Sequence, residues 1–365
     1  MTTPRLRLRD FPALVNLRRE ARERERLMGA PDLTYLFWES TLRCNLRCRH
    51  CGSGCEADTP LRELTTAEVK GILDTIAEDF DARRIFVSIT GGEPLLRKDL
   101  CEVVAHMTQL GMESCIVTNG TLLGADEVAA LVAAGMRTVS ISVDGLQDTH
   151  DAVRGEGSFQ RALRGIACAA IGGMEVVEAI TCVRPANLGQ LREIEQAVRR
   201  AGANLWRCIT IDRMGRLEGG ADPEFWLEPP QIRRLFDFLE GRRAAQQRLG
   251  LPEDVSFSCG GFVGVRREDA VRPRHNQCSA GLVVGSILCD GQVGACPSLP
   301  RSWAQGSALE TRFSKIWYER FQDYRSHAVR RQGPCADCAW YGVCLGGGLH
   351  ERLAQPDDFC WLARQ

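Results

Sequence analysis

Long apolar runs are missing from the sequence. The N-terminal stretch MTTPRLRLRDFPALVNLRREARERERL is interrupted by charge every few residues, and no later segment approaches the length of a membrane span. The sequence therefore predicts neither a secretion signal nor a membrane span, and it indicates a cytoplasmic location. Because Arg and Glu alternate at helical spacings in the same stretch, we expect a solvated amphipathic helix within an extension at residues 1–33.

An excess of charge of one sign is missing as well. Lys and Arg number 46 and Asp and Glu number 47 among 365 residues, which leaves a formal net charge of −1. This balance excludes binding of nucleic acid or of an acidic membrane through the whole surface, and we expect no nucleic-acid partner. Hydrophobic residues make up 44% of the chain, enough to fill two domains or one barrel with an appendage.

The 17 cysteines do not predict a disulfide framework, because cytoplasmic thiols are kept reduced, so metal ligands or buried thiols are expected instead. The segment TLRCNLRCRHC places Cys44, Cys48 and Cys51 at C-x3-C-x2-C spacing. A closed structural zinc site needs four ligands, so three thiols on one loop leave a metal site with an open position. Cysteine thiolates also hold iron–sulfur clusters, and a four-iron cluster held by three cysteines leaves one iron open.

Six short β-rich runs alternate with helical patterns after residue 34, which is typical of parallel strands joined by crossover helices. We therefore expect an α/β fold, with a partial (β/α)6 TIM-like barrel over residues 34–217 whose strand-to-helix loops meet on one face. Segment 218–256 predicts a linker with one helix, and 257–365 a small cysteine-rich α+β domain. Thr66 is the expected cap of the helix TAEVKGILDTIAEDF. The expected strands are YLFWES, RIFVSIT, SCIVTN, TVSISVD, VVEAITCV and LWRCITI.

The three-cysteine loop, directly after the first expected strand, resembles that of the radical S-adenosylmethionine (SAM) superfamily. The resemblance implies that the open iron of a [4Fe-4S] cluster binds SAM, whose reductive cleavage gives a 5′-deoxyadenosyl radical. TGGEPLLRKDL resembles the family's Gly-Gly-Glu motif, in which Gly91 and Gly92 permit close backbone approach and Glu93 is implied to hold the amino group of SAM. A zinc-stabilised binding protein and an electron-transfer protein without SAM are the alternatives, but neither needs this turn.

Polar residues after the later strands complete the implied SAM site. By the resemblance, Arg154 is a bidentate partner of the SAM carboxylate, and His50 occupies the position of a residue that packs near the adenine. The structural alternative for Arg154 is a surface salt bridge, and for the hydrogen-bonding candidates below it is a role in turns. The hydrogen-bonding candidates for ribose and methionine are Thr118, Asn119, Ser142 and Asp144.

A second group of cysteines in the C-terminal third resembles the SPASM domain of radical SAM enzymes. The resemblance implies one auxiliary [4Fe-4S] cluster on the four cysteines from Cys335 to Cys360. It implies another on Cys278 and Cys296 together with Cys259. A zinc ion in the C-x2-C knuckle is the structural alternative. The pattern calls for a further cysteine where the chain has Gly348, so three outcomes stay open: an open iron, replacement by Cys289, or no cluster. Asp290 and Gly291 predict the turn of a short hairpin, ILCDGQVGAC. The matching cysteines are Cys278, Cys296, Cys335, Cys338, Cys344 and Cys360.

The resemblance covers most of the chain and implies hydrogen abstraction from a peptide or small-protein substrate, with a haem precursor as the alternative and a flavodoxin or ferredoxin as electron donor. Pro297 follows Cys296 where sulfatase-maturing members have Asp, which counts against that reaction. The residues before Cys44 are too few for the leader-binding domain of many peptide-crosslinking members. Cys182 and Cys208 lie on expected strands, where either could face the cavity as a hydrogen-atom donor.

Overall fold

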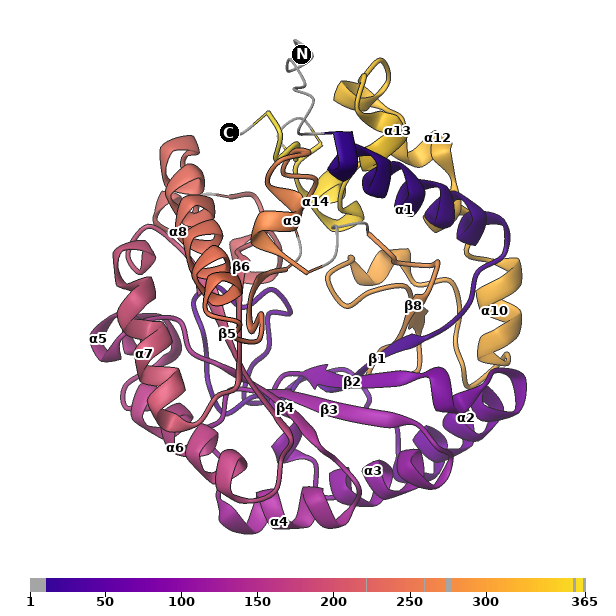
Figure 1. The fold of residues 1–365 in the computed structure, drawn as a ribbon. Helices are drawn as coiled ribbons and strands as arrows, with labels where there is room; N and C mark the ends of the chain where they lie inside the picture. The colour runs from indigo at the N-terminus through magenta and orange to yellow at the C-terminus, as the bar shows by residue number, and fades with distance from the viewer. Residues whose placement is uncertain (1–10, 221, 259, 274–277, 357–358, 364–365) are drawn as a thin grey trace.

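A nine-stranded sheet in the order β7-β6-β5-β4-β3-β2-β1-β8-β9 organises the computed structural model, which describes residues 11–220, 222–258, 260–273, 278–356 and 359–363. Each strand from β7 through β1 to β8 in this order pairs in parallel with its neighbour, and β8 and β9 pair antiparallel. The sheet curves into an open barrel (Figure 1). The strands are β1 (Tyr35–Thr41), β2 (Phe86–Gly91), β3 (Glu113–Thr118), β4 (Thr138–Ser142), β5 (Val176–Val183), β6 (Leu205–Thr210), β7 (Val255–Phe257), β8 (Val284–Ile287) and β9 (Val293–Gly294).

The larger helices surround the sheet, and the short C-terminal ones lie between α8 and α10 in Figure 1. In the described ranges, no helix is both long and apolar enough to cross a membrane. The helices are α1 (Phe11–Gly29), α2 (Thr66–Asp79), α3 (Leu100–Gln109), α4 (Ala125–Ala133), α5 (Gln147–Arg154), α6 (Ser158–Ile171), α7 (Leu191–Ala201), α8 (Pro229–Arg248), α9 (Glu268–Val271), α10 (Phe313–Glu319), α11 (Gln322–Arg325), α12 (His327–Arg330), α13 (Tyr341–Cys344) and α14 (Leu349–Ala354).

All six strands expected from the sequence are present as β1 to β6, so the parallel α/β barrel is confirmed. Side chains alternate across each strand: Val87 and Ile89 are fully buried in the core beneath the helices, whereas Ser88, between them, faces the inside of the barrel. The same alternation sets Ile141 against Ser140 on β4. The apolar side chains thus bind the helical layer, and small polar side chains leave space within the barrel.

The expected cap of α2 at Thr66 is wrong by one position. Thr65 has extended backbone angles, its hydroxyl accepts the N–H of Glu68, and the Glu68 carboxylate accepts the N–H of Thr65. This reciprocal capping box needs a Glu three residues after the cap, and only Thr65 has one. The Thr66 hydroxyl instead donates to Asp99 at 2.7 Å.

The C-terminal third is joined to the barrel through the sheet. β7 extends the sheet beyond β6, and β8 pairs in parallel with β1. The expected hairpin is confirmed, because β8 and β9 pair antiparallel and Gly291 has a φ of 89° in the turn between them. The N-terminal helix α1 is amphipathic as expected, and its Leu14 and Leu17 pack with Phe262 and Trp340 of the C-terminal third.

Candidate active site

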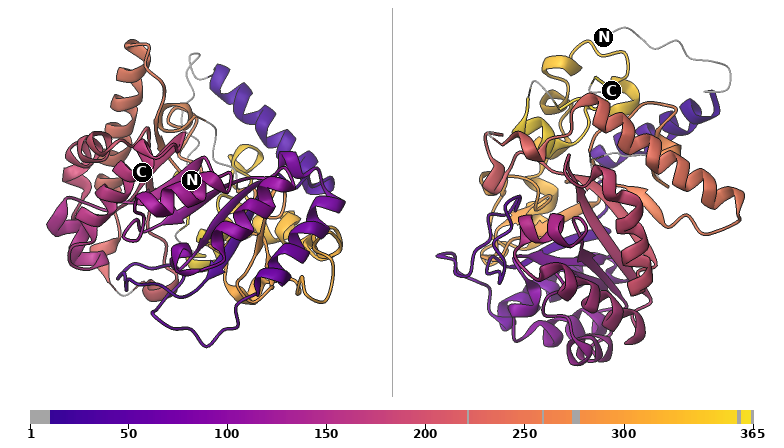
Figure 2. Two further views of the ribbon diagram at one scale, coloured as in Figure 1. Left: turned by 90° about the horizontal axis from the view of Figure 1, so that it is seen from below. Right: turned by 90° about the vertical axis from the view of Figure 1, so that its left-hand side faces the viewer.

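The loop that carries Cys44, Cys48 and Cys51 follows β1 and projects, in indigo, from the end of the barrel where the parallel strands finish (Figure 2, right). All three thiols line one cavity of about 220 Å³. Glu93 and Asp144 lie behind its wall and are fully buried. The other sequence-predicted residues that line this cavity are His50, Gly91, Gly92, Thr118, Asn119, Ser142 and Arg154.

The Gly-Gly-Glu segment holds the cysteine loop by backbone hydrogen bonds. The N–H of Gly92 donates to the Thr41 carbonyl at 2.7 Å, and the N–H of Glu93 donates to the Arg43 carbonyl at 2.9 Å. Gly91 has a φ of 127°, and a Cβ on Gly92 would stand 2.0 Å from the Arg43 carbonyl oxygen. Glycine at both positions therefore lets the end of β2 lie directly against the loop.

Arg216 holds the same loop from the segment after β6. Its guanidinium donates to the Cys48 carbonyl at 2.7 Å and to the Cys55 carbonyl, and its backbone N–H donates to the Cys51 carbonyl at 3.1 Å. No local motif marks this arginine, so the sequence alone did not reveal it. Its three contacts fix the backbone on both sides of Cys51.

The three thiols differ in how readily they ionise. Burial raises the pKa of Cys44 and that of Cys48. Hydrogen bonds from the Cys55 thiol, and then from the backbone N–H groups of Cys55 and Ser53, lower the pKa of Cys51 to about 5. Because a metal binds the thiolate rather than the thiol, Cys51 is the ligand most readily available at neutral pH.

Glu93 organises the end of β3 rather than lining the cavity. Its carboxylate accepts the Thr118 hydroxyl at 2.7 Å, the Asn119 N–H at 2.9 Å and the Leu95 N–H at 3.2 Å. Burial raises the pKa of this carboxyl, and the three hydrogen bonds oppose that effect. The Asn119 side chain in turn stands 3.9 Å from the Cys44 sulfur. Glu93 thus positions a group that touches the cysteine loop.

Replacing Glu93 with Gln is expected to weaken SAM binding roughly 10- to 100-fold, or about 1.5–3 kcal/mol. The reason is that the NH2 group of the new amide would face an N–H or O–H group that now donates to the Glu93 carboxylate. Anaerobic calorimetric titration with SAM measures the change. Glu102→Gln is the matched control, since Glu102 pairs with Lys70 on the outer surface. Unchanged affinity in the Glu93 variant would contradict this role.

Asp144 is the centre of a buried charged group. Its Oδ2 lies 2.5 Å from Arg154 Nε and 2.9 Å from His50 Nε2, while its Oδ1 accepts the Cys182 N–H at 2.8 Å. Burial raises the pKa of this carboxyl, but Arg154 and His50 outweigh burial and hold it well below its usual range. The His50 ring also stacks on Phe225. Asp144 therefore fixes two side chains of the cavity wall and does not itself reach the cavity.

The lining of this cavity fits an iron–sulfur cluster with a polar ligand. His50 and Thr90 line it, and His50 Nδ1 and Thr90 Oγ1 are buried without a hydrogen-bond partner among the described residues. Arg154 Nη1 stands 3.9 Å from the Cys48 sulfur. Unpaired buried polar atoms are costly, and metal-bound thiolates accept N–H groups from their surroundings. Three sulfurs, the guanidinium of Arg154 and two unpaired polar atoms meet here.

The two cysteines considered as hydrogen-atom donors lie in different places. Cys182 lines the cavity of the three cysteines, and its sulfur lies within 4.8 Å of ligand atoms of His50 and Asp144. Cys208 is fully buried in the hydrophobic core of the barrel. Burial raises the pKa of both thiols, so both stay protonated at neutral pH. Only Cys182 has access to the cavity.

Four C-terminal cysteines surround a second cavity, which we call the second auxiliary site: Cys335, Cys338, Cys344 and Cys360. Burial raises the pKa of Cys344 to about 12, and the neighbouring thiols Cys335 and Cys360 add to this rise. Arg352 donates to the Cys335 sulfur at 3.0 Å. Four converging thiols with a cationic donor fit one closed four-cysteine cluster.

Cys278 and Cys296 form what we call the first auxiliary site, and Cys259 falls outside the described residues. Burial raises the pKa of Cys296 to about 11, and the neighbouring thiol of Cys278 adds to this rise. Burial raises the pKa of Cys278 too, but Arg330 and Arg24 outweigh it, and the pKa falls below its usual range. Both arginines are buried, and Nε and Nη1 of Arg330 have no hydrogen-bond partner among the described residues. Two buried cations beside two thiols fit an anionic cluster.

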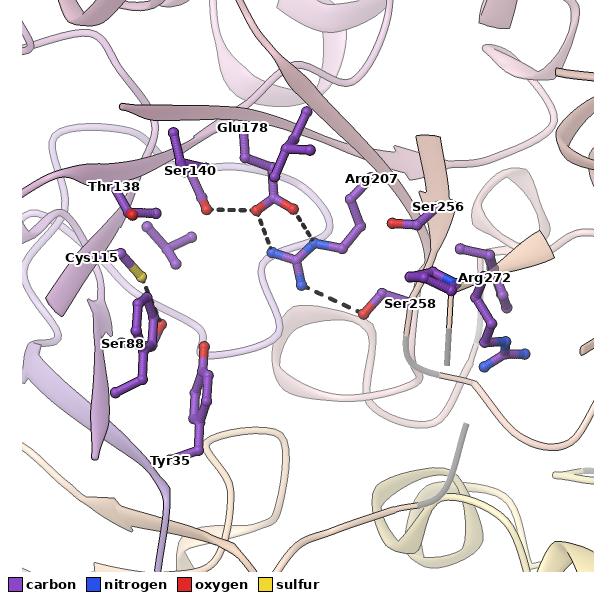
Figure 3. Close-up of a pocket in the computed structure, with 16 residues that line it drawn as sticks. Tyr35, Ser88, Cys115, Thr138, Ser140, Glu178, Arg207, Ser256, Ser258 and Arg272 are labelled. Atoms are coloured by element: carbon purple, nitrogen blue, oxygen red, sulfur yellow. Dashed lines mark hydrogen bonds and ion pairs between the residues drawn. The ribbon is translucent and has the colours of Figure 1, made fainter. Parts of the chain in front are cut away.

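A further cavity, of about 430 Å³, opens at the other end of the barrel, where the strands begin (Figure 3). Its central feature is a double ion pair between Arg207 and Glu178, with nitrogen–oxygen distances of 2.8 and 2.7 Å. Ser140 donates to Glu178 at 2.6 Å. These charges satisfy one another, and α/β barrels carry their chemistry at the opposite end. We therefore assign the active site to the cysteine end.

Comparison with known proteins agrees with this geometry. The model of the radical SAM superfamily matches residues 38–198, and that of the SPASM iron–sulfur cluster-binding domain matches residues 278–339. The mycofactocin maturase MftC of Mycolicibacterium smegmatis is 33% identical over 349 residues, covering 92% of this chain and 84% of that protein. An AdoMet-dependent heme synthase of Nitratidesulfovibrio vulgaris is 28% identical over 337 residues, covering 87% and 88%.

The fold also matches solved structures. Streptococcus suis SuiB bound to its precursor peptide SuiA superimposes with a TM-score of 0.70 at 15% identity, over 95% of this chain and 79% of that one. Together with the family match and the relative at 33% identity, this shows that the protein is an enzyme with a radical SAM barrel. The chain belongs to the radical SAM superfamily and carries a SPASM domain, and its cofactors are SAM, a [4Fe-4S] cluster that binds SAM, and auxiliary clusters.

Proposed function

We propose that this enzyme abstracts a hydrogen atom from a peptide or small-protein substrate, as the first step of a post-translational modification. In this proposal Cys44, Cys48 and Cys51 hold the cluster that binds SAM, and the cysteines of the two auxiliary sites hold the others. The reduced cluster supplies the electron that cleaves SAM and so enables hydrogen abstraction. A flavodoxin or ferredoxin supplies that electron, and the reaction takes place in the cytoplasm.

The observation that carries this proposal is a cavity of about 650 Å³ beside the cysteine loop. Gly52, the residue after Cys51, lines both this cavity and that of the three cysteines, so the two spaces adjoin. The wall of this cavity also includes residues 297–301, which directly follow Cys296. The volume is within the range of ligand pockets and accommodates several residues of a peptide. A substrate here lies between the SAM-cleaving cluster and the first auxiliary site.

The charge of this cavity favours a peptide over a haem precursor, which carries several carboxylates. Arg301 lies in its wall but pairs with Glu39 at 2.6 Å and with Asp290 at 2.8 Å. Arg213 and Glu218 also line this cavity, so its two arginines are matched in number by two glutamates, Glu39 and Glu218. A polycarboxylate would meet as many acidic as basic groups, whereas a peptide backbone needs only hydrogen-bonding partners. The maturase MftC, at 33% identity, supports the same choice, although a heme synthase is also among the relatives.

Deuterium transfer tests this proposal and does not require that the substrate be identified first. Cells that contain the gene are grown in deuterated medium, and their extract is separated into a peptide fraction and a fraction of smaller molecules that includes porphyrins. Each fraction is incubated anaerobically with the reduced enzyme and unlabelled SAM. We expect deuterium in 5′-deoxyadenosine only with the peptide fraction, as detected by mass spectrometry.

Digestion of the peptide fraction with a protease provides the control, because it should abolish the transfer if an intact peptide is the donor. Iron coproporphyrin III, prepared in deuterated form, is assayed in parallel as the haem-precursor probe. Deuterium transfer from this porphyrin, or transfer that survives proteolysis, would overturn the assignment to peptides while leaving SAM cleavage intact.

A further inference from the structure

We propose that His350 supplies the ligand that Gly348 cannot provide, and completes the first auxiliary site with an imidazole in place of a thiolate. The inference concerns this cluster alone and holds for either class of substrate. It starts from the absence of a side chain at Gly348, the N-cap of α14. The φ of Gly348 is −74°, an angle that any residue adopts, so the backbone does not require glycine there.

What occupies the place of a side chain at Gly348 is the imidazole of His350. A Cβ built on Gly348 would stand 2.9 Å from His350 Cε1 and 3.3 Å from His350 Nδ1, and 2.9 Å from Glu351 Oε2. The ring edge with Nδ1 thus fills the space that a cysteine would use. His350 is 9% exposed, so this position is inside the protein rather than on its surface.

The residues next to His350 connect it to the first auxiliary site. The backbone N–H of Leu349, between Gly348 and His350, donates toward the Cys278 sulfur. His350 also shares the wall of the 650 Å³ cavity with Pro297, the residue after Cys296. His350 thus follows a residue that contacts Cys278 and shares a cavity wall with the residue after Cys296.

The other ring nitrogen, Nε2, is buried and faces a carboxylate, without a hydrogen bond to any described residue. His350 Nε2 lies 3.3 Å from Asp212 Oδ2, and ligand atoms of His350, Asp212 and Glu351 all lie within 4.8 Å of one another. Histidines that bind metals generally donate their second N–H to a carboxylate, which fixes the ring and its tautomer. Because Nε2 faces Asp212 and Nδ1 lies 3.3 Å from the place of a Cβ at Gly348, Nδ1 is the nitrogen that we assign to iron.

Competing donors are less well placed. The Cys289 thiol stands 3.8 Å from Arg301 Nη2, and burial, followed by the charge of Glu39, raises its pKa, so it belongs to the group around Glu39 on β1. Glu351 accepts the indole N–H of Trp361 through Oε1, and its Oε2 is the oxygen beside the Gly348 position. Imidazole is also a better ligand for iron in a sulfur-rich site than a carboxylate. His350 is the donor that the described residues favour.

A histidine ligand has a chemical consequence. With a neutral imidazole, the cluster and its ligands carry one negative charge less than with a fourth thiolate. Nitrogen ligation raises the reduction potential in other iron–sulfur centres. The buried arginines Arg24 and Arg330 act in the same direction. A cluster held here would thus be suited to accept one electron from the substrate radical in the adjoining cavity, which would oxidise that radical and reduce the cluster.

Pulsed electron paramagnetic resonance on the full chain tests this inference. Cys44, Cys48 and Cys51 are replaced with Ala to remove the signal of the SAM-binding cluster, and the protein is prepared with natural or ¹⁵N-labelled histidine. In the reduced protein we expect a strongly coupled nitrogen that changes with the isotope. This coupling should disappear in His350→Ala and persist in His106→Gln, a control histidine that pairs with Asp74 on the outer face.

His350→Cys adds a second measurement. We expect it to keep the iron content, to lose the nitrogen coupling and to shift the midpoint potential downward in a redox titration. Absence of an isotope-sensitive coupling in the chain with His350 intact would overturn the inference and leave an open iron or no cluster. Persistence of the coupling in His350→Ala would overturn it too. Because the labelled chain needs no change at His350, misfolding of either variant does not prevent a decision.

Discussion

Replacing Cys44, Cys48 and Cys51 together with Ala is expected to abolish formation of 5′-deoxyadenosine while leaving the auxiliary iron bound. The three thiols line one cavity, whereas the cysteines of the second auxiliary site line another, so the loss of one ligand set does not empty the other. The protein supplies only ligands and surroundings for this chemistry, and no other described group replaces three thiolates. Chromatography of the reaction mixture and iron analysis measure the two quantities.

Cys101→Ala combined with Cys168→Ala is the matched control. These thiols lie on the outer helices α3 and α6 and are partly buried, so their removal costs some packing but touches no cavity described above. We expect this control to keep both its iron and its SAM cleavage. Deoxyadenosine production by the triple variant would contradict the assignment of the loop and place SAM cleavage at another cluster.

The fold was predictable where the signal is local. β5 coincides with the expected VVEAITCV, because eight consecutive residues carry a β-rich pattern bounded by turns. β7 and β8 were not predicted as barrel strands, because each is short and gains its place only by pairing with β6 or β1, which are distant in sequence. The contribution of the C-terminal third to the barrel sheet is thus a tertiary property, and periodicity does not reveal it.

The site shows the same division. The spacing of the cysteines on one loop predicted that Cys44, Cys48 and Cys51 lie together, and all three line one cavity, because three thiols in eight residues cannot lie far apart. Asp144 and Arg154 were expected near the bound SAM, but a sequence cannot reveal that their carboxylate and guanidinium bind each other at 2.5 Å. Arg216 and His350 were missed altogether. Their positions beside Cys51 and Gly348 depend on how distant segments meet.

Replacing Gly92 with Ala is expected to remove most SAM cleavage, with a loss of roughly 100-fold or more, because a displacement of about 1 Å in a catalytic group has that effect. The new Cβ would stand 2.0 Å from the Arg43 carbonyl oxygen and 2.6 Å from its carbon. These are backbone atoms that no rotamer change can move aside, so the backbone at Arg43, and with it the adjacent Cys44, must shift. We also expect less iron in the SAM-binding cluster and a weaker affinity for SAM.

Gly71→Ala is the matched control, since a Cβ on Gly71 in α2 meets no atom within 4 Å and the same substitution in a helix stabilises by about 0.5–1 kcal/mol. The comparison separates the contact at Gly92 from a general effect of adding a methyl group. Deoxyadenosine formation, iron content and thermal unfolding are measured for both variants. If Gly92→Ala keeps full SAM cleavage, the close approach of β2 to the cysteine loop is not required for the reaction. If it loses SAM cleavage with an unchanged unfolding temperature, the effect lies in the geometry of the loop and not in the stability of the barrel.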